Sequence, residues 1–142
     1  MAAGEVTTGR PLPEVSTGTR PFWEAVEQKR LVIQHCDACT RWIHPPLPIC
    51  PGCGLGDPGW RQVSGDGAVS AFTVVHRPPL PVFEAPYVIA LVELADAGVR
   101  LLSNVIDCDP STVDVGTRVR TVFRDVDGRT LYFFAPVGGG PA

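Results

Sequence analysis

Four cysteines that lie close together constrain the fold of this chain more than any other feature. They form two pairs with the same spacing, Cys36-x-x-Cys39 and Cys50-x-x-Cys53, and ten residues separate the pairs. A tight turn within each pair directs two thiolates at one centre, and two such turns supply a closed tetrahedral site of four sulfur atoms. The spacing therefore predicts a zinc ribbon in which these cysteines bind Zn²⁺, with iron in a rubredoxin-like site as the alternative.

The residues around the cysteines favour metal ligands over other uses of paired cysteines. Gly52 lies inside the second turn, where close approach of the backbone to sulfur favours glycine, whereas Thr40 follows the first turn in place of the more usual glycine. Disulfides do not suit a chain without an export signal, and a thioredoxin-like motif needs a single CxxC at the start of a helix. Because four thiolates fill the coordination shell, the ion should be structural, and His35 and His44 should be surface or packing residues.

Composition limits the class of protein and its partners. The chain has 142 residues with 15 Gly and 15 Pro, which favours short strands and many turns around one core or two small modules. Its net charge of −3 argues against nucleic acid and anionic lipid as general partners. The first residues lack the apolar core of a signal peptide and no later run approaches a membrane span, so we expect a cytoplasmic protein.

The order of sequence patterns predicts a mainly β protein in four parts. Residues 1–18 are rich in Thr, Gly, Pro and Glu and should form a flexible arm. Residues 19–60 should hold a short helix, with Thr19 as its cap, and then the zinc ribbon. Residues 61–136 should form a barrel, and residues 137–142 a flexible tail.

Turn signals divide the second half of the chain into five strand-like runs. Asp127-Gly128 is a strong hairpin signal between the last two runs. Five strands in about 75 residues match a five-stranded Greek-key OB-fold barrel. Ribbon strands are expected at 31–35 and 41–43, and barrel strands at 61–76, 86–94, 99–107, 117–125 and 130–135.

Several motifs in combination resemble one protein family. They are the Phe22-Trp23 helix, the prolines before the second cysteine pair, Ser64-Gly65-x-Gly67, Pro86-Tyr87, and Val115-Gly116 before a strand. The resemblance covers residues 18 to 136 and is to the rubredoxin-like zinc-ribbon plus OB-fold proteins known as domain of unknown function thirty-five. Thr40 and Ser103 stand where family members often carry glycine, whereas all four metal ligands of the family pattern are kept.

The resemblance implies a partner role in acyl-CoA metabolism. Proteins of this family are accessory subunits of thiolase-fold enzymes that act on acyl-CoA thioesters. One kind bridges a thiolase and a synthase in archaeal acetoacetyl-CoA complexes. Another pairs with a thiolase-like lipid-transfer protein to form a retro-aldolase of steroid side-chain degradation, and is sometimes fused behind a hydratase-like domain. For this chain the resemblance implies a docking subunit that supports carbon–carbon cleavage, condensation or acyl transfer by a thiolase-like enzyme.

The chain itself offers only weak candidates for catalysis. Cys108 is the one thiol outside the ribbon, and the negative charges of Asp107 and Asp109 disfavour its thiolate. His76 can serve as an acid or base for a partner's substrate, but a single histidine beside an arginine is weak support. We therefore expect no catalysis by the isolated chain.

Two apolar groups are candidates for partner docking. They are Leu80, Val82 and Phe83 of the Pro-rich loop 77–86, and Phe22 and Trp23 of the helix. The alternatives are that the loop folds back onto the barrel end and that the helix aromatics pack on the ribbon. Arg61, Arg77 and His76 are candidates for contact with CoA, on charge type alone.

Two other functions stay open. OB barrels often bind single-stranded nucleic acid, and Arg118, Arg120 and Arg124 share one face of a strand. The chain also suits a domain taken from a MaoC-like acyl-CoA hydratase assembly.

Overall fold

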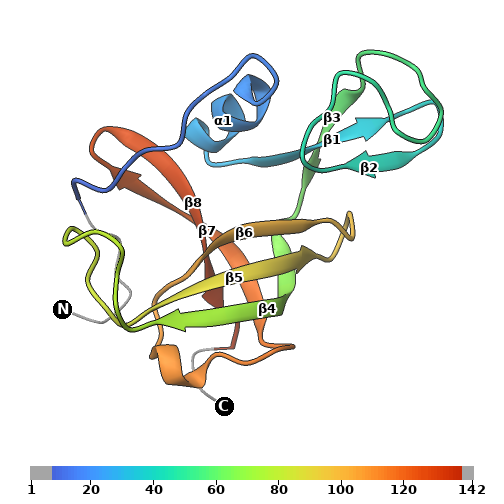
Figure 1. Cartoon of the computed structure of the whole chain (residues 1–142). Helices are drawn as coiled ribbons and strands as arrows, with labels where there is room; N and C mark the ends of the chain where they lie inside the picture. The colour runs from blue at the N-terminus through green and yellow to red at the C-terminus, as the bar shows by residue number, and fades with distance from the viewer. Residues whose placement is uncertain (1–7, 139–142) are drawn as a thin grey trace.

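The computed structural model describes residues 8–138, which form two stacked modules. A helix and a three-stranded sheet make the upper module, and a closed five-stranded barrel makes the lower one (Figure 1). The elements in chain order are α1 (Arg20–Glu27), β1 (Leu31–Cys36), β2 (Arg41–Ile43), β3 (Gly59–Val63), β4 (Asp66–Val75), β5 (Tyr87–Leu94), β6 (Arg100–Val105), the short 3-10 helix η1 (Pro110–Thr112), β7 (Arg118–Val126) and β8 (Arg129–Pro136).

Helix α1 is amphipathic and short. Pro21 lies in its first turn, where a missing backbone N–H costs nothing, and Phe22, Ala25 and Val26 are its buried side. Thr19 occupies the cap position, but its hydroxyl does not cap the helix as expected. The hydroxyl oxygen instead accepts a hydrogen bond of 3.0 Å from the backbone N–H of Ser16.

The predicted strand 61–76 is wrong, because it is two strands in two sheets. β3 pairs with β1 and completes the ribbon in the order β2-β1-β3, whereas β4 begins the barrel. The chain turns between them at Gly65, whose φ is +85°, and a Cβ atom there would lie 2.8 Å from Thr121 Oγ1. The ribbon therefore extends to Val63.

The barrel has the topology of an OB-fold, as predicted. Its strand order is β4-β5-β6-β8-β7, closed by pairing of β7 with β4, and only the β6–β8 contact is parallel. Asp127 and Gly128 have φ values of 51° and 84° and join β7 to β8 in the tight hairpin that the sequence predicts.

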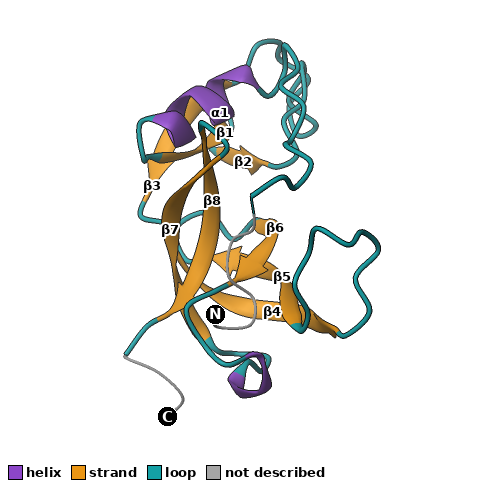
Figure 2. Ribbon diagram, turned by 90° about the vertical axis from the view of Figure 1, so that its left-hand side faces the viewer, coloured by secondary structure: helices purple, strands orange, loops and turns teal. Residues whose placement is uncertain are grey.

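One hydrophobic cluster runs through both modules. It joins Phe22, Val26 and Ile33 of the helix and ribbon to barrel residues such as Leu101 and Phe134. In Figure 2 the long β7–β8 hairpin rises from the barrel to meet α1. The cysteine-bearing end of the ribbon has a separate small cluster, formed by Cys36, Ile43 and Cys50.

The N-terminal segment makes specific contacts from residue 9 onward. The Gly9 N–H donates to Asp127 Oδ2 at 2.6 Å, and Arg129 Nη1 donates to the Pro13 carbonyl at 2.7 Å. The part of the expected flexible arm before residue 8, and the tail after residue 138, lie outside the described residues. Within 8–138, no helix is long and apolar enough to cross a membrane.

Candidate metal centre and apolar face

The four cysteines meet at the far end of the ribbon. Their sulfur atoms all lie within 4.8 Å of one another, and the Cys36–Cys53 and Cys39–Cys50 sulfur pairs are 3.6 and 3.5 Å apart. A tetrahedral Zn²⁺ with bonds of about 2.3 Å needs sulfur atoms about 3.8 Å apart. The cluster therefore has the size and the ligand set of a four-thiolate metal site, as the cysteine spacing predicts.

The Cys50–Cys53 turn favours the thiolate form of Cys50, which is the form that binds a metal ion. Hydrogen bonds from the backbone N–H groups of Cys53 and Gly52 lower the pKa of Cys50 to about 6. The hydrogen bond that Cys39 makes to Cys50 raises the pKa of Cys39 to about 11, and a bound cation competes with the proton in that bond. The first turn is strained, because Thr40 has a φ of 62°, in the left-handed region that its branched side chain disfavours.

Packing and hydrogen bonds orient the strands that carry the cysteines. His35 is buried, packs edge-on against Trp42 with ring centres 4.6 Å apart, and bonds through Nδ1 to Asp37 Oδ1 at 2.8 Å. The buried Gln34 side chain donates to the Leu47 carbonyl at 2.8 Å and accepts from the Leu47 N–H at 2.7 Å. These two bonds fix the Pro-rich connection to β1, and His35 acts as a packing residue.

The residues predicted to dock on a partner differ in how far they are exposed to solvent. Phe22 is only 7% exposed and packs edge-on against Trp23 and Tyr132, which favours its alternative role in the core. Leu80 is 42% exposed at the tip of the β4–β5 loop, and Val82 and Phe83 are half-buried.

The residues predicted to contact CoA come from two places in the chain. Arg61 lies on β3 and forms an ion pair of 3.1 Å with Asp37 of the ribbon. His76 and Arg77 are exposed just after β4.

Cys108 has the surroundings of a structural thiol. It is half-buried against the barrel core, and burial together with the charges of Asp107 and Asp109 raises its pKa. The Asp109 carboxylate also caps η1 by accepting a bond of 2.9 Å from the Ser111 N–H.

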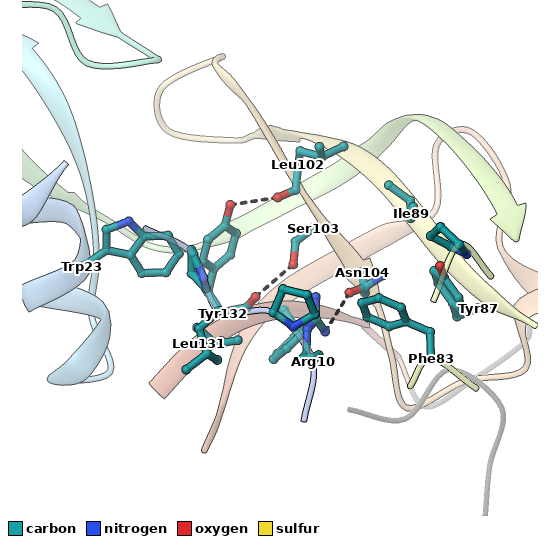
Figure 3. Close-up of a pocket in the computed structure, with 15 residues that line it drawn as sticks. Arg10, Trp23, Phe83, Tyr87, Ile89, Leu102, Ser103, Asn104, Leu131 and Tyr132 are labelled. Carbon is teal, nitrogen blue, oxygen red and sulfur yellow. Dashed lines mark hydrogen bonds between the residues drawn. The ribbon is translucent and has the colours of Figure 1, made fainter. Parts of the chain in front are cut away.

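An apolar cavity of about 510 Å³ beside the barrel was not predicted (Figure 3). Trp23 and Tyr132 stand at one end, Phe83 and Tyr87 at the other, and Arg10 lies between them. Two of these residues, Trp23 and Phe83, belong to the predicted docking groups. No sequence signal marks Arg10, because it lies in a segment whose composition is typical of a flexible arm.

Two family models match consecutive parts of the chain. Residues 23–58 match the rubredoxin-like zinc ribbon domain of ChsH2, and residues 60–124 match the C-terminal OB-fold domain of ChsH2. The boundary between the two matches lies at the start of β3, whereas in the structure the ribbon sheet ends with β3 at Val63.

Curated relatives match most of the chain. A probable enoyl-CoA hydratase alpha subunit of Thermomonospora curvata is 41% identical over 128 residues, 89% of this chain. The chain spans only 40% of the length of that subunit. A DUF35 domain-containing scaffold protein of Methanothermobacter thermautotrophicus is 34% identical, and the match covers 83% of this chain and 94% of that protein.

A solved structure described as an Ltp2-ChsH2(DUF35) aldolase contains a similar chain. The two chains are 40% identical and superpose with a TM-score of 0.83, over 89% of this chain and 100% of the other.

Proposed function

Because the chain belongs to the DUF35 family of zinc-ribbon and OB-fold proteins, we propose that it is an accessory subunit that docks on a thiolase-like enzyme and supports its acyl-CoA chemistry. The observation that carries this proposal is the match over the full length of a chain in the Ltp2-ChsH2(DUF35) aldolase. Carbon–carbon cleavage by a two-protein aldolase is the reaction we favour. Thiolase-type acyl transfer or condensation would place the same demands on this subunit.

In this proposal the chain contributes structure and surface while the partner supplies the nucleophile. The half-buried thiol of Cys108, whose pKa is raised, is a poor nucleophile. The four-cysteine site has no open position for substrate once a tetrahedral ion is bound, so the ion would stiffen the ribbon. We propose Zn²⁺ as that ion. Replacing Cys50 with Ser should abolish stoichiometric zinc in metal analysis of the purified chain, whereas Cys108→Ser should keep it.

The partner surface is proposed to include the exposed loop after β4. Leu80 is 42% exposed on this loop, and Trp23, Val82 and Phe83 lie at or near the cavity beneath it. Exposed apolar side chains on a loop beside an apolar cavity are common at protein interfaces. Arg61, Arg77 and His76 are our proposed contacts for the CoA portion of the substrate, on the grounds of exposure and charge.

Co-expression with thiolase-like proteins from the same genome tests the proposal. One of them should co-purify with this chain, and cleavage or acyl transfer of an acyl-CoA should require both proteins. Leu80→Asp should weaken the complex at least tenfold without unfolding the chain. Leu55→Asp is a matched control, because Leu55 is also exposed, at 55%, but lies in the ribbon. Turnover of a thioester by the chain alone would contradict the proposal.

A second candidate is a subunit of an acyl-CoA hydratase, because the relative from Thermomonospora curvata carries that description and is 41% identical. In that case a hydratase-like protein should co-purify and hydration of an enoyl-CoA should depend on the mixture. The two candidates are distinguished by which class of enzyme is captured and which product is formed.

A further inference from the structure

The cavity beside the barrel has the dimensions of a small-molecule site. Its volume of about 510 Å³ is within the range of ligand pockets in proteins. Its floor comes from β5, β6 and β8, and its sides from α1, the β4–β5 loop and the N-terminal segment (Figure 3). Apolar side chains such as Trp23, Ile89 and Leu131 make up most of its lining.

A positively charged side chain is held within this apolar surface. The Arg10 guanidinium carbon lies 5.4 Å from the centre of the Phe83 ring and 5.5 Å from the centre of the Phe133 ring. Its one hydrogen bond to the described residues runs from Nη1 to Asn104 Oδ1, at 3.4 Å. Burial lowers the pKa of Arg10 by removing hydration from the charged form.

The charge of Arg10 is not compensated by residues 8–138. Nε is buried without a hydrogen-bond partner there, and no carboxylate of the same residues lies within ion-pair distance. The two rings attract the cation, but they offer no acceptor to its remaining N–H donors. A half-buried cation of this kind is stabilised by any anion that can reach it.

Three other polar side chains of the cavity are already engaged. Ser103 Oγ donates to the Tyr132 carbonyl at 2.9 Å, Tyr132 Oη donates to the Leu102 carbonyl at 2.8 Å, and Asn104 Nδ2 donates to the Val88 carbonyl at 2.9 Å. Among the described residues that line the cavity, Arg10 is the one that carries a charge. A ligand that satisfies it needs an acceptor group, and negative charge adds to the attraction.

We propose that this cavity binds an amphipathic carboxylic acid, whose carboxylate lies on Arg10 and whose apolar body extends from there along the wall towards Trp23. The cavity is partly open to solvent, and its volume suits a small molecule. The single cation among its aromatic rings favours an acid over an alcohol or an amine. The proposal goes beyond the docking role and is independent of the enzyme to which the chain binds.

Binding of three twelve-carbon probes to the zinc-loaded full chain tests the proposal. Dodecanoate, 1-dodecanol and dodecyltrimethylammonium share an apolar chain and differ in the charge of the head group. The indole N–H signals of the ¹⁵N-labelled protein report the place of binding, because Trp23 lines the cavity whereas Trp42 and Trp60 lie on β2 and β3. Dodecanoate should shift the Trp23 signal and bind about tenfold or more tighter than dodecanol, with the ammonium probe weakest.

Substitutions separate the charge from the shape of the site. Arg10→Met should weaken dodecanoate about ten- to a hundredfold and leave dodecanol nearly unchanged, because a charge-assisted bond is lost. Arg120→Met, at an exposed position on β7 outside the cavity, should change neither affinity. Leu102→Glu keeps the test valid if Arg10→Met disturbs the N-terminal segment. Leu102 is 58% exposed at the cavity, and a negative charge there should weaken dodecanoate severalfold more than dodecanol.

Three results would overturn the proposal. Equal affinity for the three probes would show that the cavity selects no charge. A shift of Trp42 or Trp60 in place of Trp23 would put the probes elsewhere. If the free chain binds no probe and Arg10→Met instead weakens a complex with another protein, the cavity is a protein-docking surface.

Discussion

Replacement of Phe22 by Ala tests whether the two modules fold as one unit. Phe22 is 7% exposed and belongs to the hydrophobic cluster that joins helix and ribbon to the barrel. Its ring meets Trp23 and Tyr132 edge-on, with ring centres 5.0 and 5.4 Å apart. Tyr132 lies on β8 of the barrel, so the substitution removes contacts across the junction.

The expected loss is a large part of the stability of a chain of this size. A buried Phe→Ala change costs about 3–5 kcal/mol of unfolding free energy, the cavity left behind included. Such a loss lowers the melting temperature of a domain of this length by roughly 10–20 °C. Leu102→Ala is the control, because Leu102 is 58% exposed, and its effect should stay within about 0.5 kcal/mol.

Urea unfolding followed by two signals measures the coupling. The three tryptophans, Trp23, Trp42 and Trp60, lie on α1, β2 and β3, so their fluorescence reports the upper module. Far-UV circular dichroism reports mainly the barrel, which holds most of the strand residues. Because the core is continuous, the two transitions should coincide in the natural chain, and Phe22→Ala should lower both midpoints together.

Two results would refute this reasoning. A loss below about 1 kcal/mol would mean that Phe22 contributes little packing, contrary to its burial. A shift of the fluorescence transition alone would mean that the barrel folds independently of the helix.

Three further substitutions or conditions have defined outcomes. Thr40→Gly should stabilise the metal-loaded chain by about 1 kcal/mol, because it relieves a φ of 62°, and a lower melting temperature would contradict that account. Gly67→Ala should cost about 1–3 kcal/mol in urea unfolding, because its Cβ would lie 2.5 Å from the Glu93 carbonyl oxygen. Gly18→Ala, which meets no atom within 4 Å, is its control and should be near neutral. Burial raises the pKa of Tyr132 to about 12, above the ordinary value of 10. The contribution of the neutral Tyr132 hydroxyl to the free energy of unfolding is therefore complete below pH 10 and is lost as the pH rises towards 12. That contribution is at most about 3 kcal/mol, and a pH dependence unchanged in Tyr132→Phe would exclude this residue as its source.

The sequence predicts those features whose cause is local. Two CxxC turns can bring four sulfur atoms together only in a few ways, so the ligand set follows from spacing. The Asp127-Gly128 turn is equally local, because two consecutive residues with positive φ suit Asp and Gly. The turn signals between the apolar runs then predict the five strands of the barrel.

Features that depend on distant contacts were not predictable. The apolar pattern from 61 to 76 reads as one strand, and only the contact between Gly65 and Thr121 explains why the chain turns there. The N-terminal segment is held by Asp127 and Arg129, more than a hundred residues away. Because these contacts are distant in sequence, the composition of the segment is still that of a flexible arm, although its Arg10 lines a cavity.

The division of the hydrophobic contacts predicts that the ribbon depends on a bound metal whereas the barrel does not. Leu31, Ile33 and Val63 place one end of the ribbon in the shared core, whereas the other end has only the cluster of Cys36, Ile43 and Cys50. So few buried side chains do not offset the conformational entropy lost when two turns become ordered, and metal–sulfur bonds would supply the missing free energy. Chelation should therefore remove hydrogen-exchange protection from residues 36–58 while β5 stays protected. If β5 lost protection in the same step, metal binding would be coupled to the whole fold, and the separation of the two clusters would have no energetic meaning.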